Sequence, residues 1–498
     1  MNIVIISFTY DLSIKVINIL ILLILIMVII LKNISIWKDS IKRIKYPELN
    51  ENKNVDVLII GGGITGASTY YHLKNSHLKI ILVDQNKIGF SITGNSTGKL
   101  NYLQNDLIDK IRKNFNDEIA YNYIKSQIDA IKIIVDIINK EQIDCDLVKV
   151  KNGLYTNNDK EVTKLKNLEK FLKNNNIDVN SSTTNLVKTK YMIEVDNTYI
   201  FHPIKFIYGL LKNLDNIYEN TSIKKIDFID DYYICKTDKY EIKTKYVVLA
   251  SHYPYFNIPY LFPIKGSLEK SYLSASTYNT KSISFISYSY PFISVRNYKN
   301  YLIYISNTHS IDKDINDTKH FDELRKQLKN LKLKPEYLWS NIDIITNDGL
   351  PYIGKIKDKL LISTGYNTWG LTNGFLGGKI LSDIILNKTN QYSSLFNPKR
   401  INLSQILGNT SDIIKNINGL IQGSLYKNNQ IISKKIGNKK VMIYNHHTVI
   451  DKCPHFGCKL VFNETEKTWD CPCHGSRFDI DGKCISSPSN HDITFKNL

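Results

Sequence analysis

A short run of glycines between two apolar segments constrains the fold of this chain most. Residues 55–60 (VDVLII) are almost continuously apolar, as in a buried parallel strand, and they lead directly into residues 61–66 (GGGITG). A helix is predicted over residues 67–74, and residues 79–83 (KIILV) form a second predicted strand, which is followed by Asp84. This strand–turn–helix–strand order, with an acid at its end, predicts an α/β domain that binds a dinucleotide.

Each residue of this turn has a predicted part in dinucleotide binding. Gly61 permits the tight turn, Gly63 lets the backbone approach a pyrophosphate, and Gly66 lets the helix pack closely on the strand. The free N–H groups at the start of the helix, around Ile64, are expected to face the phosphates. Asp84 is placed to accept hydrogen bonds from the ribose hydroxyls. A glycine-rich turn that binds nothing is the alternative.

Composition excludes several classes of protein. The 498 residues are enough for two to four domains, and 43% hydrophobic and 22% charged residues are typical of a globular chain. Seven cysteines are too few for a disulfide scaffold. The formal charge of +18 raises the question of a nucleic-acid partner. The lysines are spread throughout a chain that is also rich in Ile, Asn and Tyr, so we expect no nucleic acid partner.

The N-terminus predicts a membrane anchor over residues 1–33. Residues 14–31 form an 18-residue stretch, apolar apart from Lys15 and Asn18, which spans about 27 Å as a helix. Five basic residues follow it between positions 32 and 45, and residues 34–51 are predicted to form a basic stalk. Trp37 lies where an aromatic residue at the membrane interface is expected. The positive-inside rule then places the body on the cytoplasmic side of the membrane as a single-pass protein. A cleaved signal peptide and a buried helix are the alternatives.

Two short loops near the C-terminus each combine cysteine with histidine. Residues 453–458 read CPHFGC and residues 471–476 read CPCHGS. Each loop offers one thiolate and one imidazole, and the predicted metal ligands are Cys453, His455, Cys471 and His474. A zinc site also takes two cysteines and two histidines, but zinc fingers usually place a Cys pair before a His pair.

With the tail GSRFD and the turn at Gly482, these loops resemble a Rieske iron–sulfur domain. The resemblance implies a small all-β domain (421–498) that holds a [2Fe-2S] cluster with two thiolates on one iron and two imidazoles on the other. Cys458 and Cys473 match the cysteines that form a disulfide between the loops in that family. Ser476 matches a serine that hydrogen-bonds the cluster, and Phe478 stands where high-potential members have a tyrosine.

Several motifs between residues 52 and 405 resemble the D-amino-acid oxidase family of FAD-dependent oxidoreductases. They include residues 93–100 (TGNSTGKL), 246–254 (YVVLASHYP), 348–354 (DGLPYIG) and 364–374 (TGYNTWGLTNG). The resemblance implies a Rossmann-like FAD domain of the glutathione-reductase type and an α+β substrate domain. A helix starting near Leu371 would point its N–H groups at the flavin. The further predicted FAD-binding residues are Asn95, Ser96, Thr97, Lys99, Gly365, Gly370, Leu371 and Thr372; the catalytic candidates, equally plausible as packing, are Tyr352, Asn367 and Trp369.

The parts together predict a chemistry. The order is anchor, stalk, FAD-dependent oxidoreductase (52–405), linker (406–420) and Rieske domain. We expect a membrane-anchored oxidoreductase that oxidises a small amine or amino acid by hydride transfer to FAD and passes single electrons through the cluster to an unidentified acceptor. The alternative is an electron-transfer module fed by a partner protein, without a small-molecule substrate. A Rieske oxygenase would need a mononuclear iron site, and none of the 11 histidines shows the required cluster.

Overall fold

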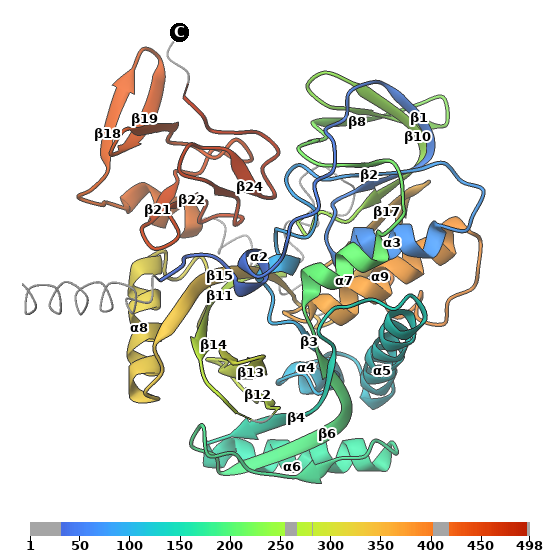
Figure 1. Cartoon of the computed structure of the whole chain (residues 1–498), viewed down its shortest axis with the longest axis vertical. Coiled ribbons are helices and arrows are strands. Elements are labelled where there is room, and N and C mark those ends of the chain that lie inside the picture. Colours follow the sequence, from blue (N-terminus) through green and yellow to red (C-terminus); the bar gives the residue numbers. More distant parts are fainter. Residues whose placement is uncertain (1–30, 254–265, 281, 402–417, 496–498) are drawn as a thin grey trace, which may run out of the picture.

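The computed structural model describes residues 31–253, 266–280, 282–401 and 418–495. Within these ranges the chain forms two large sheets with helices around them and a smaller C-terminal β-domain (Figure 1). Each of the two large sheets combines strands from segments that lie far apart in the sequence, so both depend on long-range contacts.

The first sheet is parallel at its centre. β1 (Lys53–Ile60) pairs in parallel with β2 (Ile80–Val83) on one side and with β10 (Glu241–Leu249) on the other. Parallel neighbours need a crossover, and α3 (Ile64–Leu73) supplies it between β1 and β2. The remaining strands are β7 (Ile217–Tyr218), β8 (Lys225–Ile229), β9 (Tyr232–Lys236), β16 (Tyr352–Lys357) and β17 (Leu360–Thr364). This sheet confirms the predicted dinucleotide-binding α/β fold.

The second sheet is mixed and has nine strands, with β15 (Pro335–Thr346) at one edge and β11 (Gly266–Thr277) next to it. Its other strands are β3 (Lys99–Leu100), β4 (Val148–Thr156), β5 (Asn180–Ser181), β6 (Tyr191–Ile200), β12 (Ser284–Ser287), β13 (Ser294–Tyr298) and β14 (Tyr301–Ser310). The helices are α4 (Leu107–Asn114), α5 (Asp117–Lys140), α6 (Asp159–Asn174), α7 (Pro203–Leu210), α8 (Asp317–Asn330) and α9 (Gly370–Ile385). This part therefore has α+β architecture, and its role in binding substrate stays a prediction.

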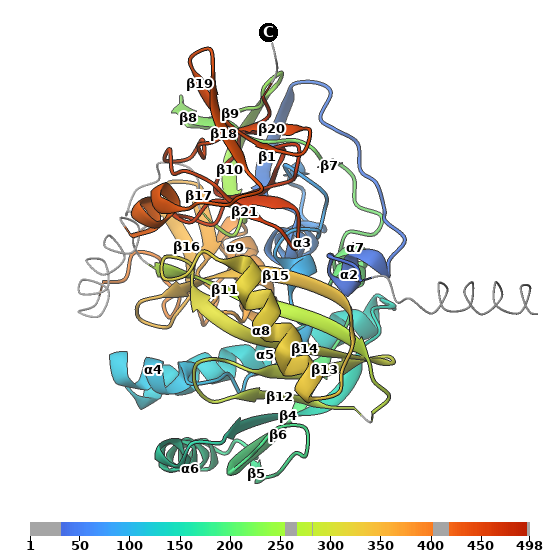
Figure 2. The ribbon, with the colours of Figure 1, turned by 90° about the vertical axis from the view of Figure 1, so that its left-hand side faces the viewer.

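The C-terminal domain consists of short antiparallel strands. One three-stranded sheet contains β18 (Ile432–Ile436), β19 (Lys439–Tyr444) and β20 (His447–Ile450). A four-stranded sheet contains β21 (Val461–Asn463), β22 (Thr468–Asp470), β23 (Arg477–Phe478) and β24 (Cys484–Ser486). The two cluster loops flank β21 and β22, as expected for a small all-β domain. The two views place this domain against the end of the second sheet, beside α8 and β15 (Figures 1 and 2).

The predicted transmembrane helix is not part of the fold that the structure supports. The segment predicted to cross the membrane, 14–31, falls almost entirely on residues 1–30, which lie outside the described residues. Across the described part of the chain, no helix combines the length and apolar character that crossing a bilayer requires. The fold class is corrected accordingly. The predicted cytoplasmic orientation depended on that helix and stays a prediction.

Part of the segment after it, which was predicted as a basic stalk, packs into the protein. Trp37, predicted at a membrane interface, lies on the short helix α2 (Ile36–Asp39) and is 0% exposed. Its indole N–H donates to the carbonyl of Ser96 at 2.7 Å, and the Arg296 guanidinium lies over its ring. Lys32 also extends the edge of the second sheet through a bridge to Tyr337. The physical reason for the correction is that the protein's own interior, rather than lipid, surrounds this tryptophan.

Candidate functional site

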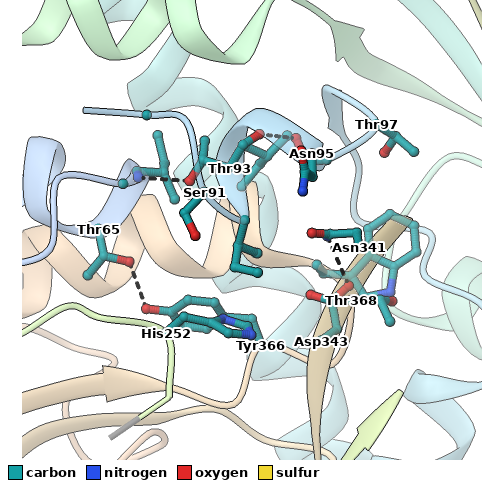
Figure 3. A pocket seen from close by; sticks show the side chains of 18 of the residues that line it. Thr65, Ser91, Thr93, Asn95, Thr97, His252, Asn341, Asp343, Tyr366 and Thr368 are labelled. Carbon is teal, nitrogen blue, oxygen red and sulfur yellow. Dashed lines mark hydrogen bonds between the residues drawn. The ribbon is translucent and has the colours of Figure 1, made fainter. Parts of the chain in front are cut away.

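A cavity lies between the two sheets and is lined by residues of both (Figure 3). Its wall combines the glycine turn after β1, the loop before β3, the start of α9 and strands of the second sheet. Most of the predicted cofactor-binding residues line it: Gly61, Gly63, Ile64, Asp84, Asn95, Ser96, Thr97, Lys99, Gly370, Leu371 and Thr372.

The turn after β1 forms one end of the cavity. Gly66 does not line the cavity, because its part is packing: a Cβ there would lie 1.9 Å from the carbonyl oxygen of Gly61. Gly61 has φ +112°, and its Cβ would lie 2.5 Å from the carbonyl oxygen of Ala250. Asp84 accepts hydrogen bonds from the backbone N–H groups of Gly62 at 2.8 Å and Asn86 at 2.7 Å. A carboxylate has further lone pairs, so Asp84 can still accept from a ribose hydroxyl.

The loop before β3 and the start of α9 form the other walls. The Lys99 amine donates to the carbonyl of Phe285 and to the Ser294 hydroxyl, each at 2.8 Å. Burial, together with the nearby Arg296, lowers the pKa of Lys99 well below its ordinary value. The Thr372 hydroxyl is already engaged by the Gln127 side chain, so α9 offers the cavity its backbone N–H groups.

Gly365 was predicted to bind the cofactor but does not line the cavity. Its φ is +75°, and a Cβ there would lie 2.5 Å from the Thr346 methyl group. Glycine therefore serves the turn between β17 and α9 at this position.

The structure separates the three catalytic candidates. Trp369 lines the cavity, and its indole N–H is buried without a hydrogen-bond partner. Tyr352 and Asn367 do not line it. Asn367 is held by Thr346 and by the carbonyl oxygens of Gly349 and Gly365, so its side chain fixes the turn. Tyr352 packs under the Arg400 guanidinium, 4.1 Å from its ring centre.

The cavity wall also includes residues that were not among the predicted site residues, such as His252, Asn341, Asp343 and Ser487. His252 follows β10 with φ +65°, and its Nε2 atom is buried without a partner. Asn341 and Asp343 project from β15, and Ser487 reaches the cavity from the C-terminal domain. Alternation along β15 could have suggested that residues 341 and 343 share a face, but no sequence signal showed that this face meets the cavity.

The cavity residues fit FAD. Glycines line the turn where a pyrophosphate would pass, an acid follows the second strand, and the N-terminus of α9 faces the cavity. His252 Nε2, Trp369 Nε1 and Asn341 Oδ1 are buried polar atoms of the wall without a partner, and a polar ligand could satisfy them.

The two cluster loops adopt the same backbone conformation. In the first loop Cys453 N–H donates to Cys458 and Gly457 N–H donates to Cys453; in the second, Cys471 N–H donates to Ser476 and Gly475 N–H donates to Cys471. Gly457 and Gly475 both have φ +73°. The equal geometry places one cysteine and one histidine of each loop at the same end of the domain.

The predicted ligands come together. Cys453 and Cys471 hydrogen-bond each other, which lowers the pKa of Cys453 to about 7. The rings of His455 and His474 lie 4.9 Å apart between centres. Cys458 and Cys473 are joined by a disulfide with a Cα–Cα distance of 6.5 Å. Their sulfur atoms also lie within 4.8 Å of the Cys471 sulfur, but disulfide sulfurs are not thiolate ligands, so Cys453 and Cys471 remain the thiolate pair.

The ligand atoms fit a [2Fe-2S] cluster. The Nδ1 atoms of His455 and His474 are buried and have no hydrogen-bond partner. Burial lowers the pKa of His455 to about 4 and that of His474 to about 3, so both imidazoles are neutral at pH 7 and can bind a metal. Two thiols and two neutral imidazoles form the donor set of a Rieske cluster.

The two histidines that would bind the cluster face the FAD domain. The ring of Tyr253 lies 5.9 Å from that of His474 and 6.3 Å from that of His455, between centres. A Cβ at Gly475 would lie 3.3 Å from the Ile342 side chain on β15. The Ser487 hydroxyl donates to the carbonyl of Ser251 at 2.7 Å. Residues 251–253 therefore touch the cavity at one end and the cluster imidazoles at the other.

A buried charge network holds the two domains together. The Lys270 side chain, 5% exposed, donates to Asp470 of the C-terminal domain at 2.7 Å and to Asp317 on α8 at 2.8 Å. Arg477 pairs with Asp470 and with Glu466, and Glu466 in turn accepts from the backbone N–H of Ser340. Five charges thus share one interface, each with an opposite partner.

Comparison with known proteins supports both halves of this description. The family described as "FAD dependent oxidoreductase" matches residues 56–384, and the "Rieske [2Fe-2S] domain" matches residues 420–495. The Bacillus subtilis (strain 168) protein YhfW, which its name assigns to the Rieske 2Fe-2S iron-sulfur proteins, is 28% identical over 91% of this chain and 95% of its own length. The gamma-glutamylputrescine oxidoreductase of Escherichia coli (strain K12) is 23% identical over 72% of this chain and 89% of its own. The crystal structure of glycine oxidase from Geobacillus kaustophilus shares the fold, with a TM-score of 0.58, 15% identity and coverage of 70% of this chain and 100% of that one.

Proposed function

Since this chain belongs to the FAD-dependent oxidoreductase family and carries a Rieske [2Fe-2S] centre, we propose that it oxidises a small amine or amino acid at the cavity and passes the electrons singly to an outside acceptor. The supporting relatives point the same way. One is named for oxidation of gamma-glutamylputrescine, an amine, and structural neighbours are named glycine oxidase and L-amino acid deaminase.

One observation carries the proposal: the segment from Ser251 to Tyr253 lies in contact with both the FAD cavity and the imidazoles of the cluster. The two histidines that would hold the cluster therefore lie on the side of the Rieske domain that faces the cavity. The buried Lys270 pairs fix this arrangement.

The two cofactors divide the electron chemistry, because FAD takes up two electrons from an organic substrate and the cluster carries one at a time. The chain's own residues place these groups. The first turn of α9 and the turn after β1 present backbone N–H groups to the cavity. Tyr253, with Leu268, Ile342 and Ile344, forms an apolar cluster at the contact between the domains, which excludes water there.

The test is an anaerobic substrate screen of the protein loaded with both cofactors. Primary amines, secondary amines and amino acids are mixed with it in turn. A substrate is expected to bleach the flavin absorbance and then to produce the EPR signal of a reduced Rieske cluster. In a His474→Ala control, bleaching is expected without that signal. If dithionite reduces both centres but no compound bleaches the flavin, the partner-fed electron-transfer module becomes the better account.

A further inference from the structure

The cavity wall carries a carboxylate, Asp343, at the end nearest α9. Asp343 and Asn341 lie on the same face of β15, beside Thr368 (Figure 3). Across the strand pair, Asp343 stands opposite Glu269 and Asn341 opposite Ser271. Two carboxylates therefore occupy directly opposed positions on adjacent strands, so each raises the negative charge around the other.

No basic side chain of the described residues pairs with Asp343. Its one hydrogen bond to a side chain comes from the Asn341 amide nitrogen at 3.4 Å. Burial, reinforced by the charge of Glu269, raises the pKa of Asp343 to about 7. A cation in the cavity would reverse both effects, because it would favour the charged carboxylate.

Asn341 supplies a second, independent observation. Its side chain is 7% exposed, and its Oδ1 atom is buried without a partner. An ionised Asp343 can only accept, so the amide must turn its NH₂ group to Asp343 and its oxygen away. The free carbonyl oxygen and the carboxylate then form a pair of acceptors, and the group that satisfies both is a donor of several N–H bonds.

The described cavity wall has few cationic side chains that could pair with an anion. Lys99 is its one lysine or arginine, and that amine is already bound by Phe285 and Ser294 on β12 and β13. Arg296 donates to the backbone carbonyls of Thr97, Gly98 and Phe201 and does not line the cavity. At this end of the cavity a substrate carboxylate would therefore meet Asp343 and no available lysine or arginine side chain of the described wall.

We propose that Asp343 and Asn341 bind the ammonium group of a cationic amine, and that the substrate is such an amine rather than an amino acid. This inference rests on the proposed function and narrows its substrate class. Glu269 adds negative charge from the opposite strand, and Trp369 adds an aromatic wall beside the ammonium group.

The test compares two probes of similar size on the FAD-loaded protein under anaerobic conditions. Propylamine and propionate are titrated separately, with binding measured by perturbation of the flavin spectrum and by calorimetry. Propylamine is expected to bind roughly 10- to 100-fold more tightly than propionate. Asp343→Asn should remove most of that preference, Asp343→Arg should reverse it, and the control Asp358→Asn, at an exposed turn, should change nothing.

The outcomes separate this inference from the proposed function. Equal binding of the two probes by the wild-type protein would overturn the inference even if the Asp343 variants failed to retain FAD. So would tight propylamine binding that survives in an Asp343→Asn variant with full FAD content. Selective propylamine binding through Asp343 without any bleaching by amines would uphold the binding site while contradicting the proposed oxidation. If amines and amino acids both bleach the flavin, and the Asp343→Asn variant is bleached as the wild type is, the proposed oxidation would be upheld and the binding site contradicted.

Discussion

At the scale of single residues, the glycines of the turn after β1 serve two different needs. A Cβ at Gly66 would meet the carbonyl oxygen of Gly61 at 1.9 Å, which is backbone and cannot move aside easily. A Cβ at Gly63 would meet the Thr93 hydroxyl at 3.1 Å, and Gly63 itself lines the cavity. Gly66 is therefore required for the packing of the fold, and Gly63 for the approach of the ligand.

The two substitutions to alanine should separate these roles. Gly66→Ala is expected to destabilise the FAD domain by roughly 1–3 kcal/mol, the usual cost of overpacking. Gly63→Ala is expected to leave the thermal unfolding of the apoprotein almost unchanged while weakening FAD binding. Thermal unfolding of apoprotein and the FAD retained after gel filtration check both. Equal losses of stability in the two variants would contradict the assignment.

Ser476 tunes the cluster through one hydroxyl. It hydrogen-bonds Cys453, and its oxygen accepts from the backbone N–H of Ser489 at 3.0 Å. Hydrogen bonds to the sulfurs stabilise the reduced, more negative cluster. Ser476→Ala is expected to lower the reduction potential by roughly 60 mV, if one bond of about 1.4 kcal/mol is lost from the reduced state alone. A redox titration followed by EPR measures this, with Ser489→Ala, which keeps its backbone N–H, as the control.

At the scale of elements, β11, α8 and β22 meet through Lys270. Burial opposes its charge, but Asp317 and Asp470 outweigh burial and raise the pKa of Lys270. Lys270→Met would leave two carboxylates buried together, and removing one partner of a buried ion pair costs about 3–5 kcal/mol. Urea unfolding followed through the cluster absorbance should show this loss. Asp470→Asn in the same chain should restore part of it, and purely additive losses would argue against a coupled network.

The same contact predicts sensitivity to acid. His309 on β14 stacks on His320 of α8, with ring centres 3.9 Å apart. Burial, together with the charge of His320, lowers the pKa of His309 to about 4, below the ordinary value of 6.5. The unfolded chain then binds more protons between pH 6.5 and pH 4, so stability falls as the pH falls through this window. His309→Gln is expected to flatten the dependence of the unfolding midpoint on pH between 6.5 and 4, whereas an unchanged slope would assign the acid sensitivity elsewhere.

The helices, strands and loops that could be predicted are those encoded by a pattern of neighbouring residues in the sequence. β1, α3 and β2 follow from an apolar run, a glycine turn and a second apolar run within about thirty residues, and the cluster loops follow from ligand spacing. Trp37 could not be placed in this way, because its surroundings come from Ser96, His202, Arg296 and Tyr298. Asp343 escaped notice for the same reason, since it belongs to the site only through the packing of two sheets.

At the scale of the whole molecule, the two centres are held in a fixed relation. The Rieske domain contacts the rest of the chain at several separate points, which include the pairs Ser251–Ser487, Ile342–Gly475 and Lys270–Asp470. Asn490 adds a fourth by donating to the carbonyl of Ile223. A domain held this way has no need to swing before it accepts an electron. This distinguishes the chain from an arrangement in which domain motion limits the rate.

The rate of electron transfer between the two centres is therefore expected to be independent of solvent viscosity and to depend on Tyr253. After rapid reduction of the flavin, the rate at which the cluster is reduced should stay constant as glycerol is added. Tyr253→Ala removes the ring that lies against both imidazoles and should slow that rate roughly tenfold, equivalent to about 1.4 kcal/mol on the barrier. Tyr253→Phe keeps the ring and should leave the rate close to that of the wild type. A rate that falls in proportion to viscosity, with both Tyr253 variants equal to the wild type, would mean that the Rieske domain must leave this docked position to work.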